Sequence, residues 1–142
     1  MKPPVERIRL GERSRYNLIT IKRRTKIESY NIICRWAFCL SLAEPSIPSP
    51  FTRPIDSNLE IAWKTFGGDF SDVFILALKQ RLKEDKLPLD EETIATQFLL
   101  HLNRGIGYLA GNKDIQRIED LIAFALTPPK WLKSAEPFSL PQ

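Results

Sequence analysis

The stretch ITIKRRTKIESYNIICRW, residues 19–36, decides the fold because it joins two helical patterns through a run of basic side chains. Apolar residues recur at helical spacing before its centre, which predicts a helix that begins near residues 12–14. A second apolar pattern predicts another helix, capped near Ser29 or Asn31 and buried on more than one side. The residues expected to hold the core here are Leu18, Ile21, Ile32 and Trp36.

The basic side chains of this stretch belong to a strongly charged first part of the chain. Residues 1–40 contain ten Lys and Arg against three acids, a net charge of +7, within a chain whose total is +4. The remaining 102 residues carry a net charge of −3. Positive potential concentrated at one end is typical of a surface that binds a polyanion. A basic tail or chance clustering is the alternative, but an ordered, partly apolar segment is a poor candidate for a tail.

The cations at the centre of the stretch are expected to bind phosphate groups. The second helix begins within a few residues of them, so its free N–H groups would meet the same phosphates. Binding of this kind depends strongly on salt and little on base sequence. The candidate DNA-binding residues are Arg7, Arg9, Arg13, Arg15, Lys22, Arg23, Arg24 and Lys26.

The segment VERIRL, residues 5–10, alternates between apolar and charged side chains and predicts a short strand. Arg7 and Arg9 would project outward together. The order strand, helix, helix resembles the ribbon-helix-helix arrangement, in which two protomers pair strands and insert the ribbon into DNA. A single short strand lacks a partner, so we expect dimerisation to supply one.

The rest of the chain predicts a mainly α protein with a short strand and about three further helices. The strand is expected in residues 59–66, and a helix over 69–85 would pack through Phe70, Val73, Phe74, Ala77, Leu78 and Leu82. The next helix is expected to be capped by Asp90 and to end at Gly105. A last helix would begin near Asp114.

One domain is expected over residues 1–142. Its parts would be a basic strand-helix-helix part (1–43), a proline-rich connector (44–54), a helical part (55–127) and a tail (128–142). No stretch reaches the roughly 18 apolar residues that a membrane span needs. We therefore expect a cytoplasmic protein.

The sequence gives little sign of an enzymatic site. His101 is the lone histidine and has no evident acid or base partner, so a packing or surface role is expected. Cys34 and Cys39, five residues apart on one helix, are too far apart for a disulfide and should be reduced, core-facing thiols. GIGYLAG, residues 105–111, lacks the context of a phosphate loop and predicts a helix stop followed by a turn. No catalytic residue, metal site or cofactor is predicted.

Three segments, YNIICRWAFCLSLAEPS, FGGDF and HLNRGIGYLAG with the later IEDL, carry a resemblance to a known family. Over residues 5–126 the chain resembles DndE, the small protein of a bacterial system that replaces a non-bridging phosphate oxygen of DNA by sulfur. The resemblance implies a non-catalytic, mainly helical homo-oligomer, a dimer or tetramer. It would bind double-stranded DNA through a basic surface, with nicked duplex preferred. The implied protein partners are a cysteine desulfurase, a PAPS-reductase-like subunit and an ATPase.

Three functional hypotheses follow. The first is a DNA-binding accessory subunit of the phosphorothioation system, which grips duplex DNA without reading bases. The second is a nickase of the same pathway, and the third is a ribbon-helix-helix transcriptional repressor. Sequence-blind phosphate binding separates the first from the third, because a repressor needs a specific site.

Overall fold

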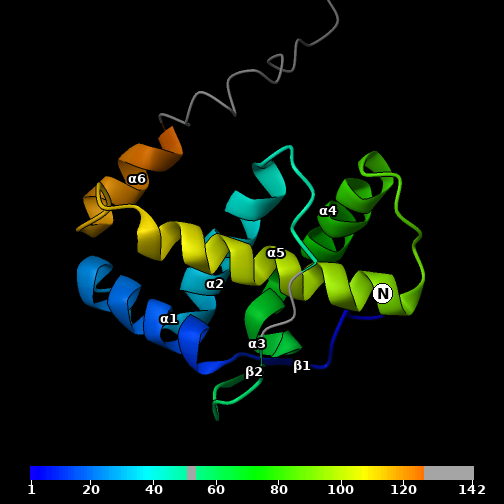
Figure 1. The fold of residues 1–142 in the computed structure, drawn as a ribbon, viewed down its shortest axis with the longest axis horizontal. Coiled ribbons are helices and arrows are strands. Elements are labelled where there is room, and N and C mark those ends of the chain that lie inside the picture. Colours follow the sequence, from blue (N-terminus) through cyan, green and yellow to red (C-terminus); the bar gives the residue numbers. More distant parts are fainter. Residues whose placement is uncertain (51–53, 127–142) are drawn as a thin grey trace, which may run out of the picture.

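A computed structural model describes residues 1–50 and 54–126 of the chain (Figure 1). The expected tail at 128–142 and part of the connector lie outside these residues. The elements, in chain order, are β1 (Arg7–Arg9), α1 (Glu12–Thr25), α2 (Tyr30–Ala43), β2 (Glu60–Ala62), α3 (Trp63–Gly67), the 3-10 turn η1 (Gly68–Phe70), α4 (Ser71–Glu84), α5 (Glu91–Gly111) and α6 (Ile118–Leu126). The prediction of a mainly helical fold that opens with a strand and two helices is confirmed.

β1 finds its partner within the chain. It pairs antiparallel with β2, with Ile8 opposite Ile61 and both side chains buried. The expectation of an unpaired strand is therefore wrong, and with it the reason for expecting the strand to drive dimerisation. The partner is the second short strand, which the sequence pattern predicted over residues 59–66. The strand covers only residues 60–62 of that range, because Trp63 already begins α3.

α1 begins where the sequence predicted and buries the face that was expected to pack. Leu18 and Ile21 are buried, and the helix start receives an outside acceptor, since the backbone N–H of Glu12 donates to Asp56 Oδ1 at 2.8 Å. A carboxylate at this position is favoured by the positive end of the helix dipole. The helix ends at Thr25, and its C-cap residue Lys26 has a left-handed φ of 64° and turns the chain toward α2.

α2 and α5 form the centre of the molecule. Gly105 lies at their closest approach, because a Cβ atom added there would stand 1.8 Å from the carbonyl oxygen of Ala37. Asp90 caps α5 as predicted and accepts the backbone N–H of Thr93 at 3.2 Å. The predicted stop at Gly105 is wrong, because α5 continues through the whole 105–111 segment to Gly111.

An aromatic cluster fills the core between α2, α3, α4 and α5. Neighbouring ring centroids lie 5.1 to 6.1 Å apart, and the rings belong to Phe38, Trp63, Phe66, Phe74 and Phe98. Edge-on and tilted pairs at this distance add to the free energy of burying large apolar rings. Because these rings come from both sides of the proline-rich connector, the first and second parts of the chain share one core.

Two helices face the core only partly as the apolar pattern predicted. On α4 Leu78 and Leu82 are buried as expected, together with Ile75 and Arg81. Val73 and Phe70, the last residue of η1, are about 60% exposed. On α2 Ile33 is fully buried, whereas Ile32 is 41% exposed and does not hold the core as expected. Trp36 is partly buried and packs against the core. Within the described residues, no helix has the length and hydropathy of a membrane span.

Candidate nucleic-acid interface

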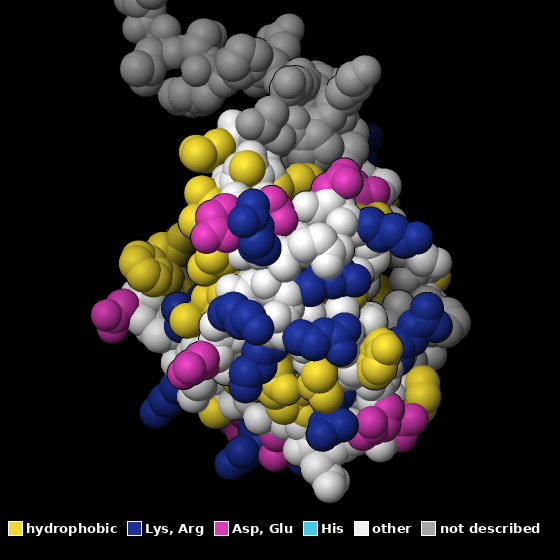
Figure 2. Space-filling model, turned by 90° about the vertical axis from the view of Figure 1, so that its left-hand side faces the viewer, with side chains coloured by type: hydrophobic (Ala, Val, Ile, Leu, Met, Phe, Trp, Pro, Cys, Tyr) yellow, Lys and Arg dark blue, Asp and Glu magenta, His cyan; other side chains and the backbone are white. Residues whose placement is uncertain are grey.

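The basic side chains at the end of α1 lie at one end of the molecule, where α1 and α5 end side by side and α6 follows (Figure 1). Lys22, Arg23 and Arg24 occupy the last turn of α1, and Lys26 is its C-cap residue. Figure 2 looks at this end. Lys and Arg side chains spread over the middle of the face, and most Asp and Glu side chains lie toward its rim.

These cations also have a local reason to be there. Positive side chains in the last turn of a helix interact favourably with the negative end of its dipole, by about 0.3 to 1 kcal/mol each at exposed positions. Lys22, Arg23 and Lys26 are exposed, and within residues 1–50 and 54–126 none of them forms an ion pair. The dipole explains why cations are stable at this position, but it leaves their charge free to attract a polyanion.

Two of the four predicted cations make contacts that orient the site. Arg24 is partly buried and its Nη1 donates to the carbonyl oxygen of Ala110 at 2.9 Å, which joins the ends of α1 and α5. Lys22 Nζ stands 5.2 Å from the ring centroid of Tyr30, the first residue of α2. Thus Lys22 lies near the start of α2, as the sequence predicted, while Arg24 has a structural role that the sequence did not reveal.

The other candidate arginines lie nearer the start of the chain, and three of them face carboxylates. Arg9 Nε is 2.8 Å from Glu60 Oε1, and Arg7 Nη1 is 3.6 Å from Glu60 Oε2. Arg15 Nη1 is 3.6 Å from Glu12 Oε2. Such exposed pairs contribute about 0 to 1 kcal/mol to stability. The carboxylates offset part of the positive charge around these arginines. The structure therefore divides the eight candidates. Arg7, Arg9 and Arg15 pair with carboxylates, Arg24 donates to Ala110, and the remaining four form no ion pair within the described residues.

A groove between α1 and the last two turns of α5 extends the basic end of the molecule. It has a volume of about 360 Å³ and is lined by Arg13, Tyr16, Asn17, Thr20, Arg23, Arg24, Gly107, Ala110 and Gly111. The two helices run in the same direction, since Ser14 contacts Asn103 and Arg24 contacts Ala110. Sequence reasoning found the arginines but missed Tyr16 and the α5 residues. The sequence does contain a signal for Tyr16. It stands three residues after Arg13 and seven before Arg23, a spacing that puts all three side chains on one side of a helix.

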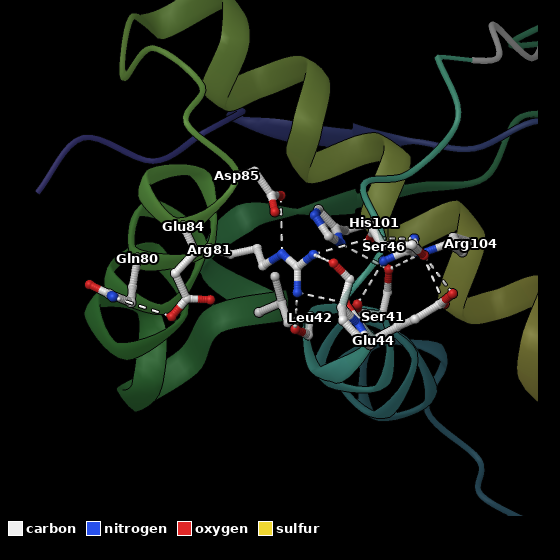
Figure 3. A network of polar contacts seen from close by, with 11 residues as sticks. Ser41, Leu42, Glu44, Ser46, Gln80, Arg81, Glu84, Asp85, His101 and Arg104 are labelled. Carbon is white, nitrogen blue, oxygen red and sulfur yellow. Dashed lines mark hydrogen bonds and ion pairs between the residues drawn. The ribbon is translucent and has the colours of Figure 1, made fainter. Parts of the chain in front are cut away.

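Two further arginines, which were not candidates, hold the proline-rich connector in place (Figure 3). Arg81 pairs with Asp85, Nε to Oδ2 at 3.0 Å, and both side chains are less than 10% exposed. Its guanidinium also donates to the carbonyl oxygens of Leu42, Glu44, Pro45 and Ser46. The last carbonyl groups of a helix lack partners within it, so a buried guanidinium stabilises the end of α2 and the turn that follows.

Arg104 of α5 reaches the same turn from the other side. Its Nε donates to Ser41 Oγ and its Nη2 to Ser41 O, both at 2.8 Å, and its Nη1 donates to Ser46 O at 2.9 Å. Glu44 Oε2 lies 3.6 Å from Arg104 Nε. The start of the connector, residues 44–46, is thereby fixed to α4 and α5.

His101 lies inside this network and is fully buried. Its Nδ1 is 2.8 Å from Ser41 Oγ, and Ser41 is fully buried as well. Burial, with the positive charges of Arg104 and Arg81, lowers the pKa of His101 to about 4, so the imidazole is neutral at pH 7. A serine and a histidine in contact can suggest a nucleophile and its base. Here neither side chain reaches the surface, so of the two roles expected for His101, packing or surface, the structure shows packing.

The two cysteines differ in exposure. Cys34 is fully buried, and burial raises the pKa of its thiol to about 12. Cys39 is exposed, so the expectation that both thiols face the core is wrong for this residue. The reason is the position of Cys39 on the side of α2 away from α5, which an apolar helix does not disclose. Both are free thiols, as predicted. Among the described residues, no group of three or more His, Cys, Asp or Glu could hold a metal ion.

Comparisons with known proteins agree with this fold. The family model of DNA sulphur modification protein DndE matches residues 7–117, which is more than three quarters of the chain. A crystal structure of DndE from Escherichia coli B7A, described as involved in DNA phosphorothioation modification, matches with a TM-score of 0.60 and 25% sequence identity. The match covers 74% of this chain and 96% of that chain. No curated protein matches. The resemblance seen in the sequence is confirmed, and the chain belongs to the DndE family of DNA sulphur modification proteins.

Proposed function

We propose that this protein is a DNA-binding accessory subunit of the phosphorothioation system that grips duplex DNA through the end of α1. The observation that carries the proposal is the set of exposed cations at Lys22, Arg23 and Lys26, with exposed Arg13 in the first turn of α1, on a chain of this family. Cations on a helix end suit phosphate groups, which dominate the affinity of proteins for DNA. Nothing in this contact reads base edges, so the binding should be largely independent of sequence.

The family also supports a set of partners. In the phosphorothioation system we expect the chain to work beside a cysteine desulfurase, a PAPS-reductase-like subunit and an ATPase, as a homo-oligomer and with nicked duplex preferred. The non-catalytic role is part of the proposal. It predicts that the pure protein leaves supercoiled plasmid intact in the presence of Mg²⁺. Open circles that increase in proportion to protein would instead establish a nickase.

Charge reversal on α1 tests the binding surface. The variant Lys22→Glu with Arg23→Glu changes two exposed side chains and spares Arg24, whose contact with Ala110 supports the fold. Duplex affinity should fall for all sequences alike, and the slope of log affinity against log salt should decrease by about two.

The matched control reverses two exposed lysines elsewhere, Lys64 on α3 and Lys83 on α4, so that net charge changes equally. This control should keep most of the affinity and the full salt slope. Equal losses in the two variants would mean that only total charge matters. An unchanged affinity of the α1 variant at matched ionic strength would show that the proposed surface is wrong.

A further inference from the structure

The groove between α1 and α5 has features that the binding of duplex DNA does not require. Its volume of about 360 Å³ lies in the range of small-molecule sites, and a few nucleotides of a single strand could lie along it. Arg13 and Arg23 stand ten residues apart on α1, which corresponds to a rise of about 15 Å along the helix. The groove therefore offers two separated cations along a path long enough for a few nucleotides.

An exposed aromatic ring stands between these two cations. Tyr16 is 68% exposed, more than any other aromatic residue among the exposed hydrophobic side chains of the described chain. It shares a side of α1 with Arg13 and Arg23 by its spacing of three and seven residues. Aromatic side chains next to cations form the platforms on which proteins stack unpaired bases, and every base has a face to stack.

On the α5 side, the groove is lined by residues with little or no side chain. Gly107 and Gly111 lie in the last two turns of α5, and a Cβ atom added at either would meet nothing within 4 Å. Glycine inside a helix is less stable than alanine, so packing within the described fold gives no reason for Gly107, while Gly111 is the last residue of α5. Gly105 differs, because the approach of Ala37 requires it. The missing side chains leave room beside α1 for a ligand.

We propose that this groove binds unpaired nucleotides of a DNA strand, with a base stacked on Tyr16 and phosphates bound by Arg13 and Arg23. The occupant is unpaired because a base inside a duplex does not present its face to a side chain. Gly107 and Gly111 leave the strand space to lie against α5. The proposal rests on the proposed DNA-binding function and adds to it the form of DNA that this part of the surface accepts.

Fluorescence anisotropy with labelled oligo(dT) and with a blunt duplex of the same length tests the groove. Tyr16→Ala should lower the affinity for oligo(dT) by roughly tenfold to a hundredfold, because base stacking on an aromatic ring contributes this much. The affinity for the blunt duplex should change little. Tyr16→Phe keeps the ring and should keep the affinity. Phe70→Ala removes another exposed aromatic side chain, on the turn before α4, and should have no effect.

A second variant tests the space rather than the ring. Gly107→Leu places a helix-compatible side chain in the groove while Tyr16 is intact, and it should also weaken oligo(dT) binding. Unchanged oligo(dT) affinity in either Tyr16→Ala or Gly107→Leu, with duplex binding normal, would overturn the groove proposal alone. A Tyr16→Ala variant that changes molecular mass in light scattering but keeps oligo(dT) affinity would overturn it in favour of an interface between copies. Duplex binding that survives reversal of Lys22 and Arg23 would overturn the proposed function itself.

Discussion

Replacing Gly105 by alanine should destabilise the fold, whereas the same replacement at Gly107, two residues further along α5, should stabilise it. At Gly105 the new Cβ atom would lie 1.8 Å from the carbonyl oxygen of Ala37, so α2 and α5 must move apart. Overpacking of a well-packed core costs about 1 to 3 kcal/mol and occasionally more. We take about 3 kcal/mol here, because the atoms that must move belong to a backbone rather than to a flexible side chain.

Alanine also removes the backbone freedom of glycine in the unfolded chain, which stabilises a helix by about 0.5 to 1 kcal/mol. The net effect at Gly105 is then a loss of about 2 kcal/mol in the free energy of unfolding. At Gly107 nothing lies within 4 Å of the new methyl group, so only the gain remains.

Urea denaturation followed by circular dichroism measures both changes. With a slope of about 2 kcal/mol per molar urea, the midpoint should fall by about 1 M for Gly105→Ala and rise by up to about 0.5 M for Gly107→Ala. The slope should stay the same in both variants, since the surface exposed on unfolding is unchanged. Midpoints that shift in the same direction would refute the assignment of Gly105 to a helix contact and Gly107 to open space.

Three further predictions follow from the buried polar network and the cysteines. Lowering the pH from 7 to 5.5 should reduce the free energy of unfolding by about 1.3 kcal/mol, because His101 binds a proton near pH 6.5 in the unfolded chain and only near pH 4 in the folded chain. Urea titrations at the two pH values should show this loss, and the variant His101→Gln should abolish it. Arg81→Met should cost about 3 to 5 kcal/mol, since it leaves Asp85 as an unpaired buried charge; a thermal midpoint within 2 °C of the wild type, less than about 1 kcal/mol for a domain of this size, would contradict this. A thiol reagent should label one cysteine per native chain, Cys39, and should reach Cys34 only after unfolding; mass spectrometry of labelled peptides would reveal any labelling of Cys34 in the native protein.

Local signals in the sequence were enough to predict most helices and their starts. The first residues of α1 and the capping of α5 by Asp90 are determined by neighbours in sequence, so pattern and cap residues suffice. The predicted end of α5 was wrong because a single sequence does not distinguish a glycine that stops a helix from a glycine that lets two helices pack closely. Likewise α2 is apolar on several sides, so its periodicity does not tell whether Ile32 or Ile33 faces the core.

The candidate site could be predicted in its charges but not in its geometry. A cluster of cations on α1 is visible as composition, and its exposure follows from the opposite, apolar face of the helix. Which arginines are free depends on partners far along the chain, such as Glu60 for Arg9 and Ala110 for Arg24. The groove was missed for the same reason, because half of it belongs to α5.

These long-range contacts also determine when the protein can fold during its synthesis. The side chains of Arg9, Ser14 and Arg24 meet partners that follow 51, 89 and 86 residues later. At a ribosomal rate of about 5 to 20 residues per second, the partner of Ser14 is added about 4 to 18 s after Ser14 itself. Until then the apolar face of α1 cannot pack against α5, and it stays exposed on the nascent chain beside the basic side chains. Chains truncated before α5 is complete should remain unfolded, so the basic end of α1, where we propose that DNA binds, takes its folded form only as the last part of the core is made.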